Sequence, residues 1–261
     1  MAYNEDMELG HSLFLGILEG LTEFLPISST GHLILASTLF GIPESATAKS
    51  FFIAIQVGAI LAVVVLYARQ FLRPAMLARL TVAFVPTGII GLAFYHFVKT
   101  HLLGNGTVVA WALIAGGVAL IAFEHFHREP PESEETVMLP YRTAFLVGLF
   151  QSIAIIPGVS RSAATIMGGL SLGLPRRTII EFSFLLAVPT MLAATGYDLV
   201  RSYQYFSADD FYLLLVGFVA SFVIALGSMR FMIEIVKKWG FTPFGWYRIV
   251  LGLFFLIYIL P

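Results

Sequence analysis

The apolar positions of this chain gather into long runs that contain few charged residues. A run of about 20 apolar residues can cross the hydrocarbon core of a bilayer as a helix. Six segments reach or approach that length, and we expect a membrane-spanning helix in each of them. They are residues 51–68, 80–98, 107–123, 178–200, 211–233 and 241–260.

Two further apolar regions are interrupted near their middle. Residues 10–42 contain Pro26, and residues 143–174 contain Pro157-Gly158. Because proline lacks a backbone N–H and disfavours helix at the preceding residue, each region should form two short helices with a break between them. Each half has only about 12–16 residues, too few to span a bilayer but enough to enter it and return. The pattern predicts two re-entrant helix pairs.

These two interrupted regions also resemble each other in sequence. The segment GILEGLTEFLPISSTGH (residues 16–32) can be written over GLFQSIAIIPGVSRSAA (residues 148–164), so that Ser29 falls over Ser160. The tripeptides GIP and GLP follow at the same offset of 131–132 residues, which is half the chain. Each half then holds one re-entrant pair and three spans. Because three is an odd number, the second half enters the membrane from the opposite face.

The expected fold class is therefore an all-α integral membrane protein with six transmembrane helices, two re-entrant helix pairs and an inverted-topology repeat. We assign residues 1–124 to the first repeat, 125–142 to a cytoplasmic connector and 143–261 to the second repeat. In proteins of this architecture the broken helices meet near the middle of the bilayer.

The basic residues favour one orientation in the membrane. With both termini outside, the loops at 69–79, 124–142, 173–177 and 230–240 lie inside. Eleven lysine and arginine residues are then on the inner side and three on the outer side, as the positive-inside rule requires. The inner set is Arg69, Arg73, Arg79, Arg128, Arg142, Arg176, Arg177, Arg230, Lys237, Lys238 and, just within the last span, Arg248; the outer set is Lys49, Lys99 and Arg201.

Composition agrees with a membrane protein and excludes several other classes. Hydrophobic residues make up 58% of the chain and charged residues 12%, with a mean hydropathy of +0.88. A soluble domain carries about twice that share of charge. The net charge of −1 argues against a nucleic-acid partner, and the absence of cysteine excludes disulfides and zinc–thiolate sites. Neither a P-loop nor an H-E-x-x-H motif is present.

Two glutamates and one arginine lie inside the interrupted regions. A charge at bilayer depth costs about 2.5–3.5 kcal/mol even on a lenient insertion scale, so Glu19, Glu23 and Arg161 need partners or water. Glu19 and Glu23 are four residues apart and share one helix face. Two adjacent carboxylates repel each other unless a cation or a proton lies between them, and oxygen ligands of this kind suit Mg²⁺ or Ca²⁺. We favour a metal-linked or proton-handling role over a pair that simply faces a water-filled crevice.

The polar run SSTGH at residues 28–32 follows Pro26 and opens the next short helix. Helix N-termini expose unpaired N–H groups that can seat a phosphate, although serine and threonine there are also ordinary caps. In the second region Arg161 lies at the matching helix start. If the repeat is inverted, both N-termini point at one volume, where an arginine fork grips a phosphoryl group and a hydroxyl beside a histidine can act as a nucleophile. Gln56 and Gln151 are expected to supply supporting hydrogen bonds.

Three motifs give the chain a family resemblance. They are EGLTEFLPISSTGH at 19–32, PGVSRSAAT at 157–165 and EFSFLLAVP at 181–189. On these motifs the chain resembles the undecaprenyl pyrophosphate phosphatase family, also called bacitracin-resistance proteins. The resemblance covers essentially the whole chain.

The resemblance implies an enzyme that hydrolyses undecaprenyl pyrophosphate to undecaprenyl phosphate and inorganic phosphate. It further implies a role in recycling the lipid carrier of peptidoglycan synthesis, resistance to bacitracin, a need for a divalent cation, and a place in the bacterial cytoplasmic membrane. In that family the active site opens toward the outer face, in agreement with the orientation that the charges favour.

The family's functional residues can be carried over position by position. The resemblance gives Ser29 as the nucleophile, His32 as the histidine, Arg161 as the phosphate-gripping arginine, and Glu19 with Glu23 as the glutamate pair that would hold the cation. We hypothesise that Ser29 attacks the terminal phosphorus while His32 or a glutamate takes its proton; attack by His32 or by water stays open. The remaining candidate phosphate-binding residues are Ser28, Thr30, Ser160, Ser162 and Thr165.

Two other classes of function fit parts of the sequence. Inverted repeats with broken helices are typical of transporters, so a transporter or flippase of a polyprenyl phosphate lipid is the chief alternative. A purely structural membrane scaffold is the third. Small-residue pairs such as Gly16/Gly20 and Gly116-Gly117 allow close helix approach within one subunit or between two, which leaves a homodimer open.

Overall fold

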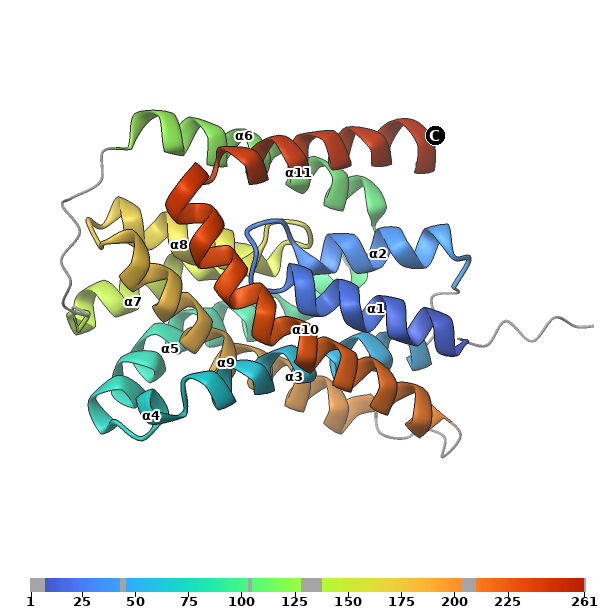
Figure 1. Cartoon of the computed structure of the whole chain (residues 1–261), viewed down its shortest axis with the longest axis horizontal. Coiled ribbons are helices and arrows are strands. Elements are labelled where there is room, and N and C mark those ends of the chain that lie inside the picture. Colours follow the sequence, from blue (N-terminus) through green and yellow to red (C-terminus); the bar gives the residue numbers. More distant parts are fainter. Residues whose placement is uncertain (1–7, 43–45, 103–104, 128–137, 203–209, 261) are drawn as a thin grey trace, which may run out of the picture.

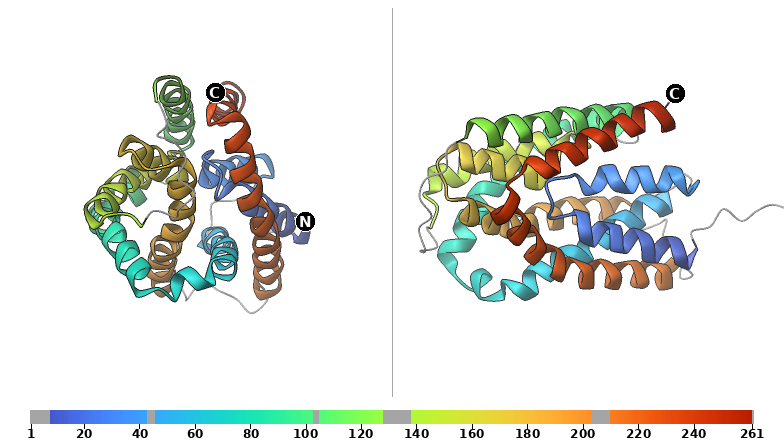
Figure 2. Two further views of the ribbon diagram at one scale, coloured as in Figure 1. Left: turned by 60° about the vertical axis from the view of Figure 1, so that its left-hand side comes forward. Right: turned by 45° about the horizontal axis from the view of Figure 1, so that its top comes forward.

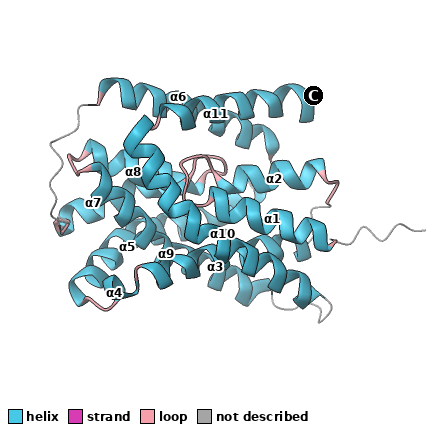
Figure 3. Cartoon of the chain, viewed as in Figure 1, coloured by secondary structure: helices cyan, strands magenta, loops and turns pink. Residues whose placement is uncertain are grey.

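The computed structural model describes residues 8–42, 46–102, 105–127, 138–202 and 210–260. Every regular element within these ranges is a helix (Figure 3). The α-helices are α1 (Leu9–Thr22), α2 (Ser29–Leu39), α3 (Ala46–Leu66), α4 (Ala68–Phe71), α5 (Pro74–Phe97), α6 (Gly106–Phe126), α7 (Tyr141–Gln151), α8 (Arg161–Ser171), α9 (Arg176–Ser202), α10 (Asp210–Trp239) and α11 (Thr242–Phe254). Short π- or 3₁₀-helical turns extend three of them: η1 (Val98–Leu102), η2 (Ser152–Ile155) and η4 (Phe255–Ile259).

Five of the described helices are long and apolar enough to cross a membrane. They are Pro74–Phe97, Gly106–Phe126, Arg176–Tyr197, Phe211–Trp239 and Thr242–Ile259. The expected span at 51–68 corresponds to α3, whose described apolar part, Phe51–Leu66, is shorter. Large apolar side chains such as Ile89 on α5 and Val223 on α10 are exposed along these helices. Because lipid tolerates such a surface and water does not, the fold is that of an integral membrane protein.

The helices of the two halves interleave (Figures 1 and 2). α1 packs along α10, and α7 packs along α5; α3 contacts α9, and α6 lies beside α11. Glycines permit the closest approaches, because a Cβ at Gly16 would lie 2.9 Å from the Cα of Gly217, and one at Gly148 would meet the carbonyl of Ala83. Gly116 and Gly117 face α11 of the same chain in the same way.

Both interrupted regions do form pairs of short helices. We call residues 23–28, between α1 and α2, the first hinge, and residues 156–160, between η2 and α8, the second hinge. Each hinge ends on a serine with a left-handed backbone, Ser28 at φ 71° and Ser160 at φ 73°. Each serine caps the following helix by accepting a hydrogen bond from the backbone N–H three residues later.

The structural register of the two pairs corrects the sequence alignment by one residue. Ser28, not Ser29, is the counterpart of Ser160, because both are the N-cap residue. Ser29 and Arg161 are therefore equivalent, each as the first residue of its helix. The second hinge holds one more residue between its proline and its serine, so an alignment on the prolines is shifted there.

Candidate active site

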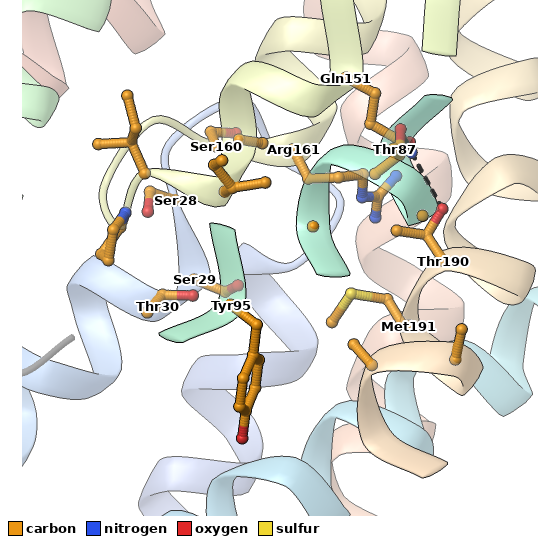
Figure 4. A pocket seen from close by; sticks show the side chains of 18 of the residues that line it. Ser28, Ser29, Thr30, Thr87, Tyr95, Gln151, Ser160, Arg161, Thr190 and Met191 are labelled. Atoms are coloured by element: carbon orange, nitrogen blue, oxygen red, sulfur yellow. Dashed lines mark hydrogen bonds between the residues drawn. The ribbon is translucent and has the colours of Figure 1, made fainter. Parts of the chain in front are cut away.

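A cavity of about 530 Å³ lies between the two hinges and the facing walls of α5 and α9. Its inner end is polar. Figure 4 shows Ser28, Ser29 and Thr30 on one side of this end, with Ser160 and Arg161 coming from the other half of the chain. The rest of the lining is largely apolar or small, with two tyrosines, Tyr95 and Tyr197; its other members include Phe84, Gly88, Gly91, Leu92, Ala154, Met191, Ala193 and Ala194.

Glu23 is the centre of the polar end. Its Oε2 accepts a hydrogen bond of 2.6 Å from the Ser29 hydroxyl, and its Oε1 pairs with Nη2 of Arg161 at 2.9 Å. Its side chain is only 4% exposed. The carboxylate therefore links a hydroxyl from the first half of the chain to a cation from the second half, and the hydrogen bonds are of the short, charge-assisted kind.

Arg161 is held in place by α9. Its Nη1 donates to the carbonyl of Ser183 at 2.8 Å and lies 3.3 Å from the Ser183 hydroxyl. Its Nε has no acceptor among the described residues. With one edge anchored by Glu23 and Ser183, the guanidinium keeps donor capacity for an anion in the cavity.

Glu19 lies one helical turn before Glu23 and is completely buried. Neither of its carboxylate oxygens has a hydrogen-bond donor among the described residues. The charges of Glu23 and Arg161 both act on it, although Glu19 does not line the cavity itself. A buried carboxylate without a donor is costly, so Glu19 needs a proton or a cation beside it.

The other predicted hydroxyls from the second half divide into two groups. Ser160 lines the cavity, whereas Ser162 and Thr165 lie behind its wall. Ser162 donates to the carbonyl of Leu25 at 2.9 Å and so joins the start of α8 to the first hinge. Thr165 donates to the Arg161 carbonyl at 2.8 Å within its own helix. In this structure Ser162 and Thr165 support the site and do not face it.

His32 is also turned away from the cavity. Its Nδ1 lies 2.7 Å from the carbonyl of Ser28, so that nitrogen donates, and its Nε2 lies 2.7 Å from the Tyr247 hydroxyl. The two rings are stacked, with 5.5 Å between their centroids. The side chain is buried and is not part of the cavity lining. Of the two proton acceptors considered for Ser29, only Glu23 is in contact with it.

Comparison with known proteins shows the family to which the chain belongs. The family described as "Bacitracin resistance protein BacA" matches residues 12–254. This chain belongs to that family. An undecaprenyl-diphosphatase of Persephonella marina is 50% identical over 256 residues, which cover 97% of this chain and 100% of that protein. The enzyme of the same name from Bdellovibrio bacteriovorus is 51% identical over 252 residues, covering 95% and 94%, and that from Aquifex aeolicus is 47% identical over 250 residues, covering 95% and 98%.

The motifs of the BacA family do not account for every polar residue at the cavity. Gln151 donates from Nε2 to the hydroxyls of Thr87 and Thr190, at 3.0 Å each, and accepts from Thr165 at 3.3 Å. This cluster joins α5, α7, α8 and α9 along one cavity wall. The sequence indicated Gln151 as a supporting residue. It did not indicate Thr87 or Thr190, because both lie in apolar spans and outside the three motifs. Gln56 does not line the cavity.

Arg248, counted with the inner set just within the last span, does not face the inner surface. The structure buries it completely and surrounds it with backbone carbonyls of the hinges and α6. A single charge inside an apolar span is the signal that could have placed it in the interior. Arg128 and the side chains of Lys49, Lys99 and Arg201 lie outside the described residues.

The residues present fit a divalent cation that is shared with a phosphate substrate. Among the described residues no three histidine, aspartate or glutamate side chains gather to hold a metal alone. Glu19 does offer two oxygens without donors beside the carboxylate of Glu23. Mg²⁺ commonly takes one or two carboxylates and completes its shell with water and substrate phosphates, so two glutamates suffice.

Proposed function

We propose that this protein hydrolyses undecaprenyl pyrophosphate to undecaprenyl phosphate and inorganic phosphate, and so returns the lipid carrier to peptidoglycan synthesis and confers resistance to bacitracin. The near full-length similarity to undecaprenyl-diphosphatases supports this activity. The observation that carries it is the contact of Ser29 and Arg161 with one carboxylate, Glu23, at the end of a cavity with an apolar mouth.

Ser29 is the proposed nucleophile and Glu23 its general base. As the Ser29 oxygen bonds to the terminal phosphorus, its proton passes along the 2.6 Å hydrogen bond to Glu23. The bond between that phosphorus and the bridging oxygen breaks, and undecaprenyl phosphate leaves with the proton from Glu23. Water then attacks the phosphoserine while Glu23 accepts one of its protons. The bond between phosphorus and the Ser29 oxygen breaks, Glu23 returns that proton to the Ser29 oxygen, and inorganic phosphate departs.

Arg161 stabilises the charge that develops on the phosphoryl oxygens during both steps. Its position is set before substrate arrives, because Ser183 and Glu23 hold the guanidinium from two sides. The N-termini of α2 and α8 add backbone N–H groups at the same end of the cavity, with Ser28, Thr30 and Ser160 around them. These groups form the proposed binding site for the two phosphates.

A divalent cation, Mg²⁺ or Ca²⁺, would be held by Glu19 and Glu23. When bound, it supplies positive charge that neutralises the phosphoryl oxygens. Glu19 has a clear reason to be a ligand, because its buried oxygens have no donor among the described residues. Glu23 keeps its contacts with Ser29 and Arg161 and so connects the proposed metal site to the proposed nucleophile.

The apolar part of the cavity suits the polyprenyl chain of the substrate. Small residues of α5 and α9, which are Gly88, Gly91, Ala193 and Ala194, alternate in the lining with the larger Phe84, Leu92, Tyr95, Met191 and Tyr197. A Cβ at Gly91 would meet nothing within 4 Å. Leu92 is exposed beside this gap. A lipid tail can therefore reach the gap from the side while its pyrophosphate enters the polar end.

The proposed architecture is six spans and two re-entrant pairs in an inverted repeat, with both termini outside. Two features support it: the paired geometry of the hinges, and the exchanged packing in which α1 meets α10 while α7 meets α5. The cavity is lined by the halves of α5 and α9 farthest from the basic residues Arg79 and Arg176. With those residues inside, the cavity opens toward the outer face of the bacterial membrane.

A flippase would need the same phosphate grip, so the decisive experiment removes the membrane gradient. Purified protein in detergent should release phosphate from a polyprenyl pyrophosphate, and Glu23→Gln should lower kcat by about 10²–10⁴-fold because the general base is lost. Glu181→Gln is the matched control, since its exposed pair with Arg177 lies away from the cavity. No phosphate release by the wild-type protein would contradict the proposed function.

The covalent step has its own test. Rapid acid quench of a slowed variant such as Arg161→Ala should trap phosphate on Ser29, detectable by mass spectrometry of the peptide. If phosphate is released but no phosphoserine forms under any quench condition, water attacks directly and Ser29 has another role.

A further inference from the structure

Arg248 of α11 is completely buried, yet its described neighbours include no carboxylate within ion-pair distance. Instead, all the hydrogen-bonding capacity of its guanidinium is directed at the backbone. A guanidinium has five N–H donors in a fixed planar fork. The five acceptors are the carbonyl oxygens of Pro26, Ala112, Leu113, Gly158 and Val159, at 2.9–3.3 Å.

One nitrogen of this fork joins the two hinges. Nη1 donates to Pro26 of the first hinge at 3.1 Å and to Val159 of the second hinge at 3.0 Å. These carbonyls lie two residues before Ser28 and one residue before Ser160. The same atom therefore links the two backbone segments that precede the capping serines, which are followed directly by Ser29 and Arg161.

The other nitrogens fix this junction to a rigid helix. Nη2 donates to Gly158 at 2.9 Å and to Ala112 of α6 at 3.0 Å, and Nε donates to Leu113 of α6 at 3.3 Å. The guanidinium lies against Gly116, where a Cβ would come within 2.6 Å of Cζ. The absence of a side chain at this position of α6 leaves the room that the guanidinium occupies.

We propose that Arg248 is a positioning residue that sets the separation of the two hinges, and with it the distance between Ser29 and Arg161. This contact would affect catalysis through the backbone, because the two hinges come from opposite halves of the chain and each leads directly into a helix whose first residue, Ser29 or Arg161, belongs to the proposed site. Arg248 touches neither the cavity nor a proposed catalytic side chain. The inference rests on the proposed function, which the wild-type phosphate-release assay tests first.

Three substitutions test the proposal in different ways. Arg248→Met removes all five donors, Arg248→Lys keeps the charge and three donors at a single nitrogen, and Gly116→Ala leaves Arg248 in place but presses on its guanidinium. Arg79→Met is the matched control, because Arg79 also donates to two backbone carbonyls, those of Ala75 and Leu139, away from the hinges.

The measured quantities are kcat and KM per folded molecule, with folding followed by size-exclusion chromatography and thermal unfolding. A displacement of about 1 Å between reacting groups can cost about 100-fold in rate, so Arg248→Met should lose about that much in kcat. KM should change far less, because Arg248 does not line the cavity in which the substrate is proposed to bind. Arg248→Lys should recover part of the loss, Gly116→Ala should fall between Arg248→Lys and wild type, and Arg79→Met should match wild type.

The proposal is overturned if Arg248→Met folds and keeps kcat within threefold of wild type, or if Arg79→Met loses as much as Arg248→Met does. Should Arg248→Met fail to fold, Gly116→Ala decides: wild-type kcat per folded molecule in that variant contradicts a positioning role, and a lowered kcat with unchanged KM supports it. An inactive wild-type protein would instead count against the proposed function, so the two failures can be told apart.

Discussion

The first hinge and the second hinge end in the same backbone conformation, but the residues that follow them differ in charge. Both end on a capping serine in the left-handed region, Ser28 and Ser160. In the structural register the first helical residue is Ser29 in one half and Arg161 in the other. The first half thus supplies the Ser29 hydroxyl and the glutamate carboxylates, and the second half supplies the guanidinium of Arg161.

The same contrast extends one helix back. Glu19 on α1 and Gln151 on α7 occupy equivalent positions in the register that pairs Ser28 with Ser160. Gln151 is neutral, and its amide is hydrogen-bonded to three threonine hydroxyls. Glu19 is buried with no donor among the described residues. In one half the side chain at this position joins helices, and in the other it is a carboxylate without a hydrogen-bond donor among the described residues, so two similar helix pairs need not carry the same chemistry.

The largest expected effect comes from removing the guanidinium of Arg161, the charged group that the second half contributes. Arg161→Ala leaves Glu23 without its ion-pair partner and the phosphoryl oxygens without a guanidinium. Because arginines that stabilise phosphoryl transfer contribute about 10³-fold or more, kcat for phosphate release should fall by at least that factor. Arg177→Ala is the control, since the side chain of Arg177 is 77% exposed and pairs only locally with Glu181. Equal activities of the two variants would remove Arg161 from the proposed site.

An intermediate effect is expected from giving the first half the side chain of the second. Glu19→Gln should lower the affinity for Mg²⁺ or Mn²⁺ by more than about 10- to 100-fold. That range applies when only an outer-shell partner of a metal ligand is lost, whereas Glu19 is a proposed ligand itself. Electron paramagnetic resonance of Mn²⁺ bound to the purified protein measures this without reference to turnover. Chelator should abolish the bound signal in wild type, and Glu181→Gln should bind Mn²⁺ as wild type does. Unchanged binding in Glu19→Gln would remove that residue from the proposed metal site.

The smallest expected effect is on stability, and it comes from the capping serine at the end of each hinge. Ser28→Ala and Ser160→Ala each remove one helix cap, so each should lower the free energy of unfolding by about 1 kcal/mol. Glycine at either position should cost only a few tenths of a kcal/mol, since it lacks the cap but tolerates a positive φ. Unfolding in detergent provides the measurement. If one alanine variant is several times more destabilised than the other, the hinges are not equivalent in the way the register suggests.

Much of the site followed from the sequence, because its parts are locally encoded. Proline breaks, polar residues at helix starts and charges inside apolar segments led to Glu23, Ser29 and Arg161, and the structure brings these three together. His32 lies in the same motif, but its ring pairs with Tyr247 on α11, a contact that no local pattern indicates. The alignment on prolines also missed the register by one residue, because backbone conformation and not residue type defines the cap.

The sequence by itself determined the helical membrane fold class, the two interrupted pairs and the candidate residues of the proposed site. These properties depend on neighbours within one or two helical turns, where hydrophobic length, proline and capping act. Only the tertiary structure decided which polar residues face the cavity, which stand behind it, and where Arg248 lies. Those outcomes depend on contacts between residues more than 80 positions apart, such as Arg248 with Pro26 and Val159. A buried donor forms hydrogen bonds with whichever carbonyls the tertiary packing brings within reach.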